Sequence, residues 1–162
     1  MITFVICSVD PDRSRRTELN IRRSSGIDPE IFIHDNRETG WGLCKTYNHY
    51  ASQARSDYLC FLHEDFSFRT ASWARTIVDF YRATPGAGVI GFFGYALKTR
   101  SPSLMGGLSR YERASLYQHI GERVVRLESR AGEADFSPVV QVDGQCLIVP
   151  KAVWREHPFD EE

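Results

Sequence analysis

The fold of this chain is decided by the stretch Asp57-Tyr58-Leu59-Cys60-Phe61-Leu62-His63-Glu64-Asp65, in which an apolar run ends in three ionisable side chains. A run of about six apolar or aromatic residues is typical of a strand buried on both faces of a parallel sheet. In open α/β sheets, ligands bind just beyond the carboxyl ends of the strands. His63, Glu64 and Asp65 are therefore expected at the mouth of a crevice, where acids are costly unless they meet a cation or a ligand. A second interpretation is that they cap the helix that follows.

Strands and helices alternate on either side of this stretch. Apolar runs predict further strands over residues 2–7, 31–33 and 88–93. Helices are expected over residues 13–24 and 43–54, and a third helix is expected to start after Thr70 or Ser72 with Trp73, Ile77, Phe80 and Tyr81 on its buried face. This β-α-β-α-β-α-β order predicts an α/β fold, in which helices cover both faces of a mainly parallel central sheet in three α/β/α layers.

The alternation is lost after Gly94. Residues 94–115 are rich in Gly and Ser and are predicted to form a long loop, which we expect to fold over a bound ligand. A strand is expected over 123–127 and another over 139–149, interrupted at Asp143-Gly144, and Pro150 is expected as the first residue of a helix through Trp154. No linker or internal repeat interrupts the chain, so we expect a single domain over residues 1–162.

The composition is that of an ordinary globular protein. The chain has 162 residues, is 42% hydrophobic and 25% charged, and carries a formal net charge of −1, so no global field favours nucleic acid as a partner. No apolar run approaches the ~18 residues that a transmembrane segment needs, and the N-terminus lacks the features of a signal peptide. The four cysteines form no C-x-x-C pair, which favours free thiols and a cytoplasmic location.

Carboxylates gather at the ends of the first three predicted strands. Asp10 follows the first strand, Asp35 the second, and Glu64 and Asp65 the third, and in a parallel sheet all of these lie on one edge. Such an edge suits a nucleotide whose diphosphate is bridged by Mg²⁺ or Mn²⁺. Asp35 is suited to accept a hydrogen bond from the base, and Lys45, on a helix that begins near Gly42, adds a positive charge for phosphate. The P-loop, dinucleotide-binding and zinc-ligand spacings are absent from the sequence.

The same residues carry a resemblance to a known family. Asn48, followed by Ala51, Ala54 and the stretch 57–65, resembles the nucleotide-sugar half of family-2 type glycosyltransferases. In those enzymes of the GT-A fold, a helix carrying an Asn precedes a strand that ends in an Asp-x-Asp motif. The ending His63-Glu64-Asp65 is similar to the glycosyltransferase-like branch of that group, and residues 142–151 with the ending Phe159-Asp160-Glu161 resemble its acceptor-side segment.

The resemblance implies a function and a site. It implies a transferase that moves a sugar from a uridine-linked nucleotide-diphospho-sugar to a glycan, lipid or protein acceptor, with inversion and with the help of Mn²⁺ or Mg²⁺. About 1–93 would form the nucleotide-binding half and about 94–162 the acceptor-side half. The general base would be Asp160 or Glu161. The metal ligands would be Asp65 and His63, and the donor-binding residues would be Ser8, Asp10, Asp35, Lys45, Asn48, His63 and Glu64.

Two departures from the family pattern leave alternatives open. His63 replaces the first acid of Asp-x-Asp, and a neutral imidazole is a poor ligand for Mg²⁺, so His63 would bind Mn²⁺ or instead contact the ribose or a phosphate. Members of the family generally continue beyond Phe-Asp-Glu, so we expect a truncated form, an incomplete gene product or a relative without catalysis. The alternative function is a non-catalytic nucleotide- or glycan-binding module. A third, a nucleotidyltransferase, needs a Gly-rich loop after the first strand, which residues 7–11 do not supply.

Overall fold

The computed structural model describes residues 1–98, 100, 109–129 and 135–162. The chain forms two compact units, one made of residues 1–89 and 145–162 and the other of residues 90–144. Residues 145–162, which the sequence analysis grouped with the second half, therefore pack with the N-terminal residues. That the whole chain behaves as a single domain stays a prediction.

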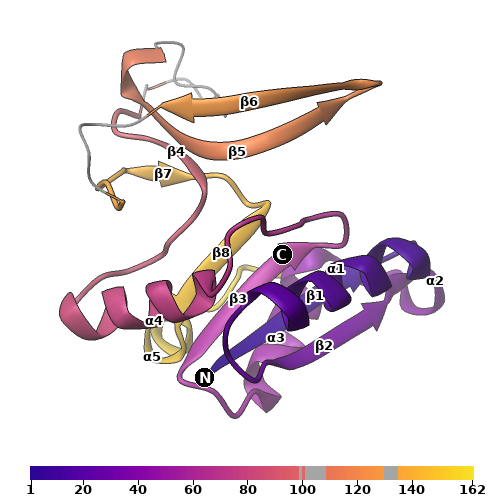
Figure 1. Cartoon of the computed structure of the whole chain (residues 1–162). Helices are drawn as coiled ribbons and strands as arrows, with labels where there is room; N and C mark the ends of the chain where they lie inside the picture. The colour runs from indigo at the N-terminus through magenta and orange to yellow at the C-terminus, as the bar shows by residue number, and fades with distance from the viewer. Residues whose placement is uncertain (99, 101–108, 130–134) are drawn as a thin grey trace. The chain divides into compact units, whose positions relative to one another are not determined.

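The first unit is built on a sheet with the strand order β2-β1-β3-β8 (Figure 1). These strands are β1 (Ile2–Ser8), β2 (Glu30–Asp35), β3 (Tyr58–His63) and β8 (Cys146–Pro150). β1 is parallel to both β2 and β3, whereas β8 is antiparallel to β3. The predicted α/β class is confirmed, but the sheet is mixed, so the prediction of a mainly parallel sheet is corrected.

The strand predicted over residues 88–93 is the source of that error. Only Phe93 of this range lies in a strand, β4 (Phe93–Tyr95), which belongs to the second unit. The place beside β3 is taken by β8, whose Cys146, Ile148 and Val149 are buried. Branched side chains bury more apolar surface than the glycines at 88 and 91, which explains why the C-terminal strand occupies this position.

Helices cover both faces of this sheet. They are α1 (Pro11–Ser24), α2 (Asn36–Thr39), α3 (Leu43–Gln53), α4 (Trp73–Ala83) and α5 (Lys151–Glu156), of which α2 was not predicted and α5 begins one residue after Pro150. Neighbouring residues of a strand point to opposite faces. On one face, Phe4 contacts Trp73 with ring centroids 5.9 Å apart, and on the other, Val5 joins the core that includes Tyr47 of α3. These contacts account for the three-layer order of the unit.

The stretch that ends in the three ionisable residues is the centre of this unit. Leu59, Cys60, Phe61 and Leu62 of β3 have no exposed surface. Complete burial of each large apolar side chain contributes about 1.5–3 kcal/mol, so β3 is held firmly between its two neighbouring strands. The chain emerges from the core at His63, which is exposed.

The second unit is an antiparallel sheet with the order β6-β5-β4-β7. β5 (Glu112–Ile120) and β6 (Arg123–Ser129) form a long hairpin, and β7 (Gln141–Val142) lies on the other side of β4 (Figure 1). The strand predicted over 123–127 is confirmed, and the predicted interruption at Asp143-Gly144 separates β7 from β8. The loop predicted over 94–115 is wrong at both ends, where β4 and β5 lie. Its residues 99 and 101–108 lie outside the described residues, so its folding over a ligand stays a prediction.

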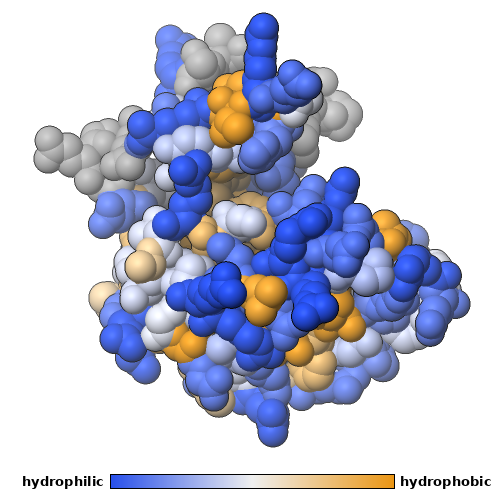
Figure 2. Space-filling model, turned by 45° about the vertical axis from the view of Figure 1, so that its right-hand side comes forward, coloured by the Kyte–Doolittle hydropathy of each residue, from blue (hydrophilic) through white to orange (hydrophobic). Residues whose placement is uncertain are grey.

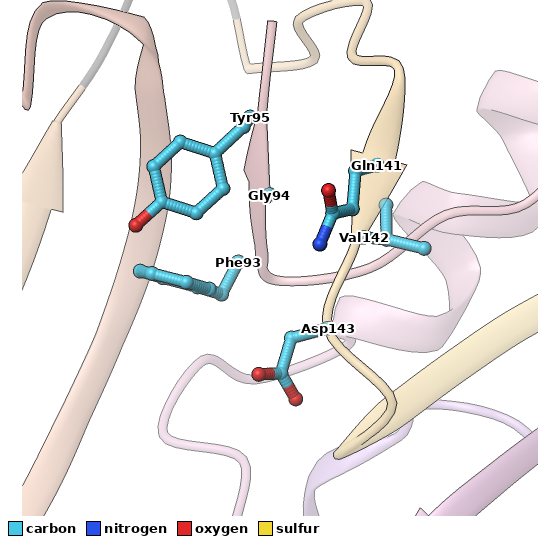
Figure 3. A pocket seen from close by; sticks show the side chains of 6 residues that line it. All are labelled: Phe93, Gly94, Tyr95, Gln141, Val142 and Asp143. Carbon is cyan, nitrogen blue, oxygen red and sulfur yellow. The ribbon is translucent and has the colours of Figure 1, made fainter. Parts of the chain in front are cut away.

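The contact between β4 and β7 depends on a glycine. Figure 3 shows Gly94 between the side chains of β4 and those of β7 and Asp143. A Cβ atom on Gly94 would lie 2.4 Å from the carbonyl oxygen of Gln141, a separation that no side chain tolerates. The absence of a side chain at this position is what lets the two strands pair.

Eleven large apolar side chains of the described residues are exposed. On the face that Figure 2 shows, hydrophobic residues are scattered among hydrophilic ones. All four cysteines are free thiols, as predicted. Among the described residues, no helix has the length and hydrophobicity needed to cross a membrane.

Candidate functional site

The candidate site lies at the carboxyl ends of the three parallel strands. The strand register places Ser8 beside Asp35 and Cys7 beside His63. The predicted donor-binding residues of these strand ends, although up to 57 positions apart in the sequence between Ser8 and Asp65, are thus brought to one edge of the sheet. The expectation that a parallel sheet gathers them is confirmed, because it follows from the strand directions alone.

Glu64 ties the end of β3 to the turn that follows β1. One of its carboxylate oxygens, Oε2, accepts hydrogen bonds from the Ser8 hydroxyl at 2.7 Å and from the backbone N–H groups of Val9 and Asp10, both at 2.9 Å. Partial burial opposes ionisation of this carboxyl group, but the three donors outweigh burial and hold the pKa of Glu64 below its ordinary value. Glu64 therefore stays ionised and keeps the turn after β1 in place.

Asp10 and Asp35 each cap the helix that follows their strand. Oδ1 of Asp10 accepts from the N–H groups of Asp12 and Arg13, and Oδ1 of Asp35 accepts from the N–H of Arg37. The alternative in which residues 63–65 cap the next helix is wrong, because α4 begins only at Trp73. The capping acids are those of the first two strands, where a helix starts within three residues of the strand end.

Two arginines from these helix starts also bind the acids of the edge. Arg13 lies between two carboxylates, with Nε 3.2 Å from Asp10 Oδ2 and Nη1 3.9 Å from Asp65 Oδ2. Arg37 binds Asp35 through Nε and Nη2 at 2.9 and 2.5 Å. The hydrogen bonds from Arg37 lower the pKa of Asp35 to about 2. The edge therefore presents alternating positive and negative charge rather than carboxylates alone.

Lys45 and Trp41 form an aromatic and cationic group beside this edge. The Lys45 ammonium lies 4.8 Å from the centroid of the Trp41 ring, and Trp41 stacks on His34 with centroids 4.9 Å apart. His34 is buried and its ring nitrogens contact Tyr50 and Thr39. His34 is therefore a packed residue of the core beneath Trp41. Lys45 is exposed and free to meet an anion.

The segment that carries the C-terminal acids is bound to α3 through Phe159 and Glu161. Asn48 donates hydrogen bonds from its amide nitrogen to the carbonyl of Phe159 and to Glu161 Oε1, both at 2.8 Å. The Phe159 ring packs against Phe61, with centroids 4.9 Å apart. Asp160 lies between these two anchored residues and is exposed. The structure thus brings Asn48, predicted to bind the donor, together with the predicted catalytic residue Glu161.

Comparison with known protein families gives a match to the glycosyltransferase-like family over residues 3–162. The chain belongs to the glycosyltransferase-like family. No curated protein matches it. The resemblance stated from residues 48–65 and 142–161 is therefore confirmed, and membership supports a transferase of the glycosyltransferase type.

The two acids at the end of β3 in this glycosyltransferase-like protein differ in how they are engaged. Glu64 is committed to the turn after β1, whereas the only contact of Asp65 within the described residues is Arg13. No group of three or more His, Cys, Asp or Glu side chains is placed to hold a metal in the described part of the chain. Mg²⁺ is often held by one or two carboxylates together with substrate phosphates. Of the two predicted ligands, Asp65 has the carboxylate chemistry that Mg²⁺ prefers, whereas the imidazole of His63 suits Mn²⁺ better.

The sequence analysis of this glycosyltransferase-like chain missed Arg13 and Arg37. Both follow a strand-terminal Asp at short spacing, Asp10-x-x-Arg13 and Asp35-x-Arg37, at the start of a helix. An acid at an N-cap with an arginine in the first turn is a recognisable local signal. The bridge from Arg13 to Asp65 has no such signal, because it spans 52 positions.

Proposed function

We propose that this chain has the GT-A fold and transfers a sugar from a uridine-diphospho-sugar to an acceptor hydroxyl with inversion, assisted by Mn²⁺ or Mg²⁺. The observation that carries the proposal is the difference between neighbouring acids at the end of β3. Glu64 is hydrogen-bonded to the turn after β1, whereas Asp65 is 61% exposed and its ion pair with Arg13 is long, at 3.9 Å. An exposed carboxylate at the carboxyl end of a central strand is suited to a shared metal.

Each side chain at the edge has a role in this proposal. Glu64 holds the Ser8–Asp10 turn as a preformed wall for the nucleoside, and Asp35 accepts a hydrogen bond from the base. In this proposal, the cationic side chains of Lys45 and Arg13 bind phosphate oxygens. Metal bound at Asp65 and His63 would neutralise the charge that develops on the diphosphate leaving group.

The acceptor-side acids supply the proton acceptor. A carboxylate of Asp160 or Glu161 takes the proton of the acceptor hydroxyl as its oxygen forms a bond to the anomeric carbon. The bond from that carbon to the diphosphate oxygen breaks on the opposite side, so the configuration is inverted. No covalent intermediate with the protein is formed.

The alternative is a non-catalytic nucleotide- or glycan-binding module. It is favoured by His63, whose neutral imidazole brings no negative charge where the family motif has an acid. Binding of UDP without any hydrolysis or transfer of UDP-glucose would identify this alternative.

Calorimetric titration of UDP and GDP, with and without Mn²⁺, tests the proposal. We expect UDP to bind in a Mn²⁺-dependent manner and Asp65→Ala to weaken that binding by at least tenfold, since one charge-assisted ligand contributes about 1.5–3 kcal/mol. The matched control is Asp79→Ala on α4, because Asp79 is also 61% exposed and pairs with an arginine. The metal-assisted function would be refuted if the Asp65→Ala variant and the wild type bound UDP with equal affinity, or if UDP binding did not depend on Mn²⁺.

A further inference from the structure

We infer that Asn48 is a positioning residue, which orients the carboxylate of Glu161 at the donor edge by holding residues 159–161 against α3. This inference rests on the proposed function, because it assigns Glu161 rather than Asp160 as the proton acceptor. It gives Asn48 a role within the protein that differs from the donor contact predicted from the sequence.

The amide of Asn48 uses all of its hydrogen-bonding capacity. A side-chain amide has two N–H donors and an oxygen with two lone pairs. Nδ2 donates to the Phe159 carbonyl and to Glu161 Oε1, both at 2.8 Å, and Oδ1 accepts from the Phe159 N–H at 3.1 Å and from the Trp154 indole N–H at 3.0 Å. Asn48 therefore binds both the N–H and the carbonyl of Phe159 and also the Glu161 carboxylate. Together these bonds fix the position and the orientation of residues 159–161.

The bonds distinguish the two acids of this segment. Glu161 receives its hydrogen bond from a side chain 113 positions away, so its carboxylate is anchored to α3. Asp160 instead accepts from the N–H of Glu162, which is a local contact within the exposed C-terminal segment. A proton acceptor must be held within about 0.5 Å of its working position, and of these two acids only Glu161 is anchored outside its own segment.

Packing brings the anchored segment towards the motif at the end of β3. The ring of Phe159 lies against Phe61 and Tyr47, with centroids 4.9 and 5.6 Å away. Residues two apart on a strand share a face and are separated by about 7 Å, so His63 follows Phe61 on the same face at the edge. Asn48 therefore links the segment of the predicted base to the face of β3 that carries His63.

A second asparagine provides a matched control for this arrangement. Asn20 of α1 holds Phe68 in the same manner, since its Nδ2 donates to the Phe68 carbonyl at 3.0 Å and its Oδ1 accepts from the Phe68 N–H at 2.7 Å. Asn20→Ala removes an equivalent amide-to-backbone contact without touching the C-terminal acids. The difference between the two variants isolates the effect on Glu161.

The test measures hydrolysis of UDP-glucose with Mn²⁺ in the wild type and in Asn48→Ala, Asn48→Asp, Glu161→Gln and Asn48→Ala/Glu161→Gln variants. Because a general base contributes about 10²- to 10⁴-fold, we expect Glu161→Gln to lower kcat by at least 100-fold. Asn48→Ala should lower kcat by about tenfold or more with the KM for UDP-glucose changed less than twofold, as expected for a misplaced group. In the Glu161→Gln background, removal of Asn48 should have no further effect on kcat, because both changes disable the same carboxylate.

Asn48→Asp keeps the acceptor for Phe159 and Trp154 but puts a carboxylate oxygen where Nδ2 donated to Glu161, so the segment keeps two of its hydrogen bonds while Glu161 is repelled. Hydrogen exchange of the Phe159 amide should accelerate by about tenfold in Asn48→Ala and be unchanged in Asn20→Ala. The inference would be overturned, while the proposed function stands, if the effects of Asn48→Ala and Glu161→Gln on kcat were additive. It would also be overturned if Asn20→Ala lowered kcat as much as Asn48→Ala. A wild-type protein that binds no UDP would refute the proposed function, and unchanged exchange at Phe159 would refute the anchoring itself.

Discussion

The clamp that Glu64 forms on the turn after β1 makes a measurable contribution to stability. Glu64→Gln keeps the shape of the side chain but removes the charge from an oxygen that accepts hydrogen bonds from Ser8, Val9 and Asp10. A hydrogen bond to a charged group contributes about 1.5–3 kcal/mol and a neutral one about 1 kcal/mol. One oxygen accepts from all three donors, and the site is only partly buried. We therefore expect Glu64→Gln to lower the free energy of unfolding by about 1–3 kcal/mol at pH 7.

The pH dependence of this loss has a definite sign. The pKa of Glu64 is lower in the folded protein than in the unfolded chain, where it is about 4.3, so the contribution is present above that value and disappears as the pH falls through the folded pKa. The difference in stability between the wild type and Glu64→Gln should therefore shrink as the pH falls below the unfolded value and disappear below the folded pKa.

Urea unfolding at pH 7 and pH 3.5, followed by tryptophan fluorescence and circular dichroism, measures both quantities. The control is Glu18→Gln, which breaks an ion pair with Arg22 on the surface of α1 and should cost no more than about 0.5 kcal/mol. A loss at pH 7 no larger than that of the control, or a difference that grows as the pH falls, would show that Glu64 does not clamp the turn as an ionised group.

Two further predictions concern other parts of the structure. Gly94→Ala places a Cβ atom 2.4 Å from the Gln141 carbonyl oxygen, so we expect the pairing of β4 with β7 to be lost. Faster hydrogen exchange of the β4 and β7 amides would detect this loss, and unchanged exchange would contradict it. For Asp35, carboxyl ¹³C titration should give a midpoint of about 2 in the wild type, and Arg37→Gln should move it up towards the ordinary value, since Arg37 donates the hydrogen bonds that favour the charged form. An unchanged midpoint in Arg37→Gln would disprove that cause.

Much of the first unit was predictable from local pattern. The apolar run before His63, the helical spacing from Leu43 onwards and the acids after each strand are signals within a few residues of one another. The topology rule for parallel strands then places Asp10, Asp35 and Asp65 at one edge without any knowledge of side-chain contacts. The strand over 88–93 failed because hydrophobicity alone does not tell which of two apolar segments pairs with β3.

The groups of the protein that each site residue binds were not predictable in the same way. Glu64 and Asp65 are adjacent acids with similar chemistry, yet one is bound to the turn after β1 and the other is largely exposed. Which of them is used within the protein depends on the direction of each side chain at the strand end. Asn48 is a similar case, since its partners Phe159 and Glu161 lie more than a hundred positions away.

Hydrophobic periodicity and strand direction were enough to predict the α/β class and the edge at which the acids gather, because these signals act locally and repeat along the chain. The family was indicated by the motifs at residues 48–65 and 142–161. The folded structure was needed to show that β8 runs antiparallel beside β3, that Glu64 is a clamp, and that Asn48 holds the segment of Glu161. Each of these depends on which groups distant in sequence meet within about 3 Å, and such hydrogen bonds are settled by the packing of the whole unit.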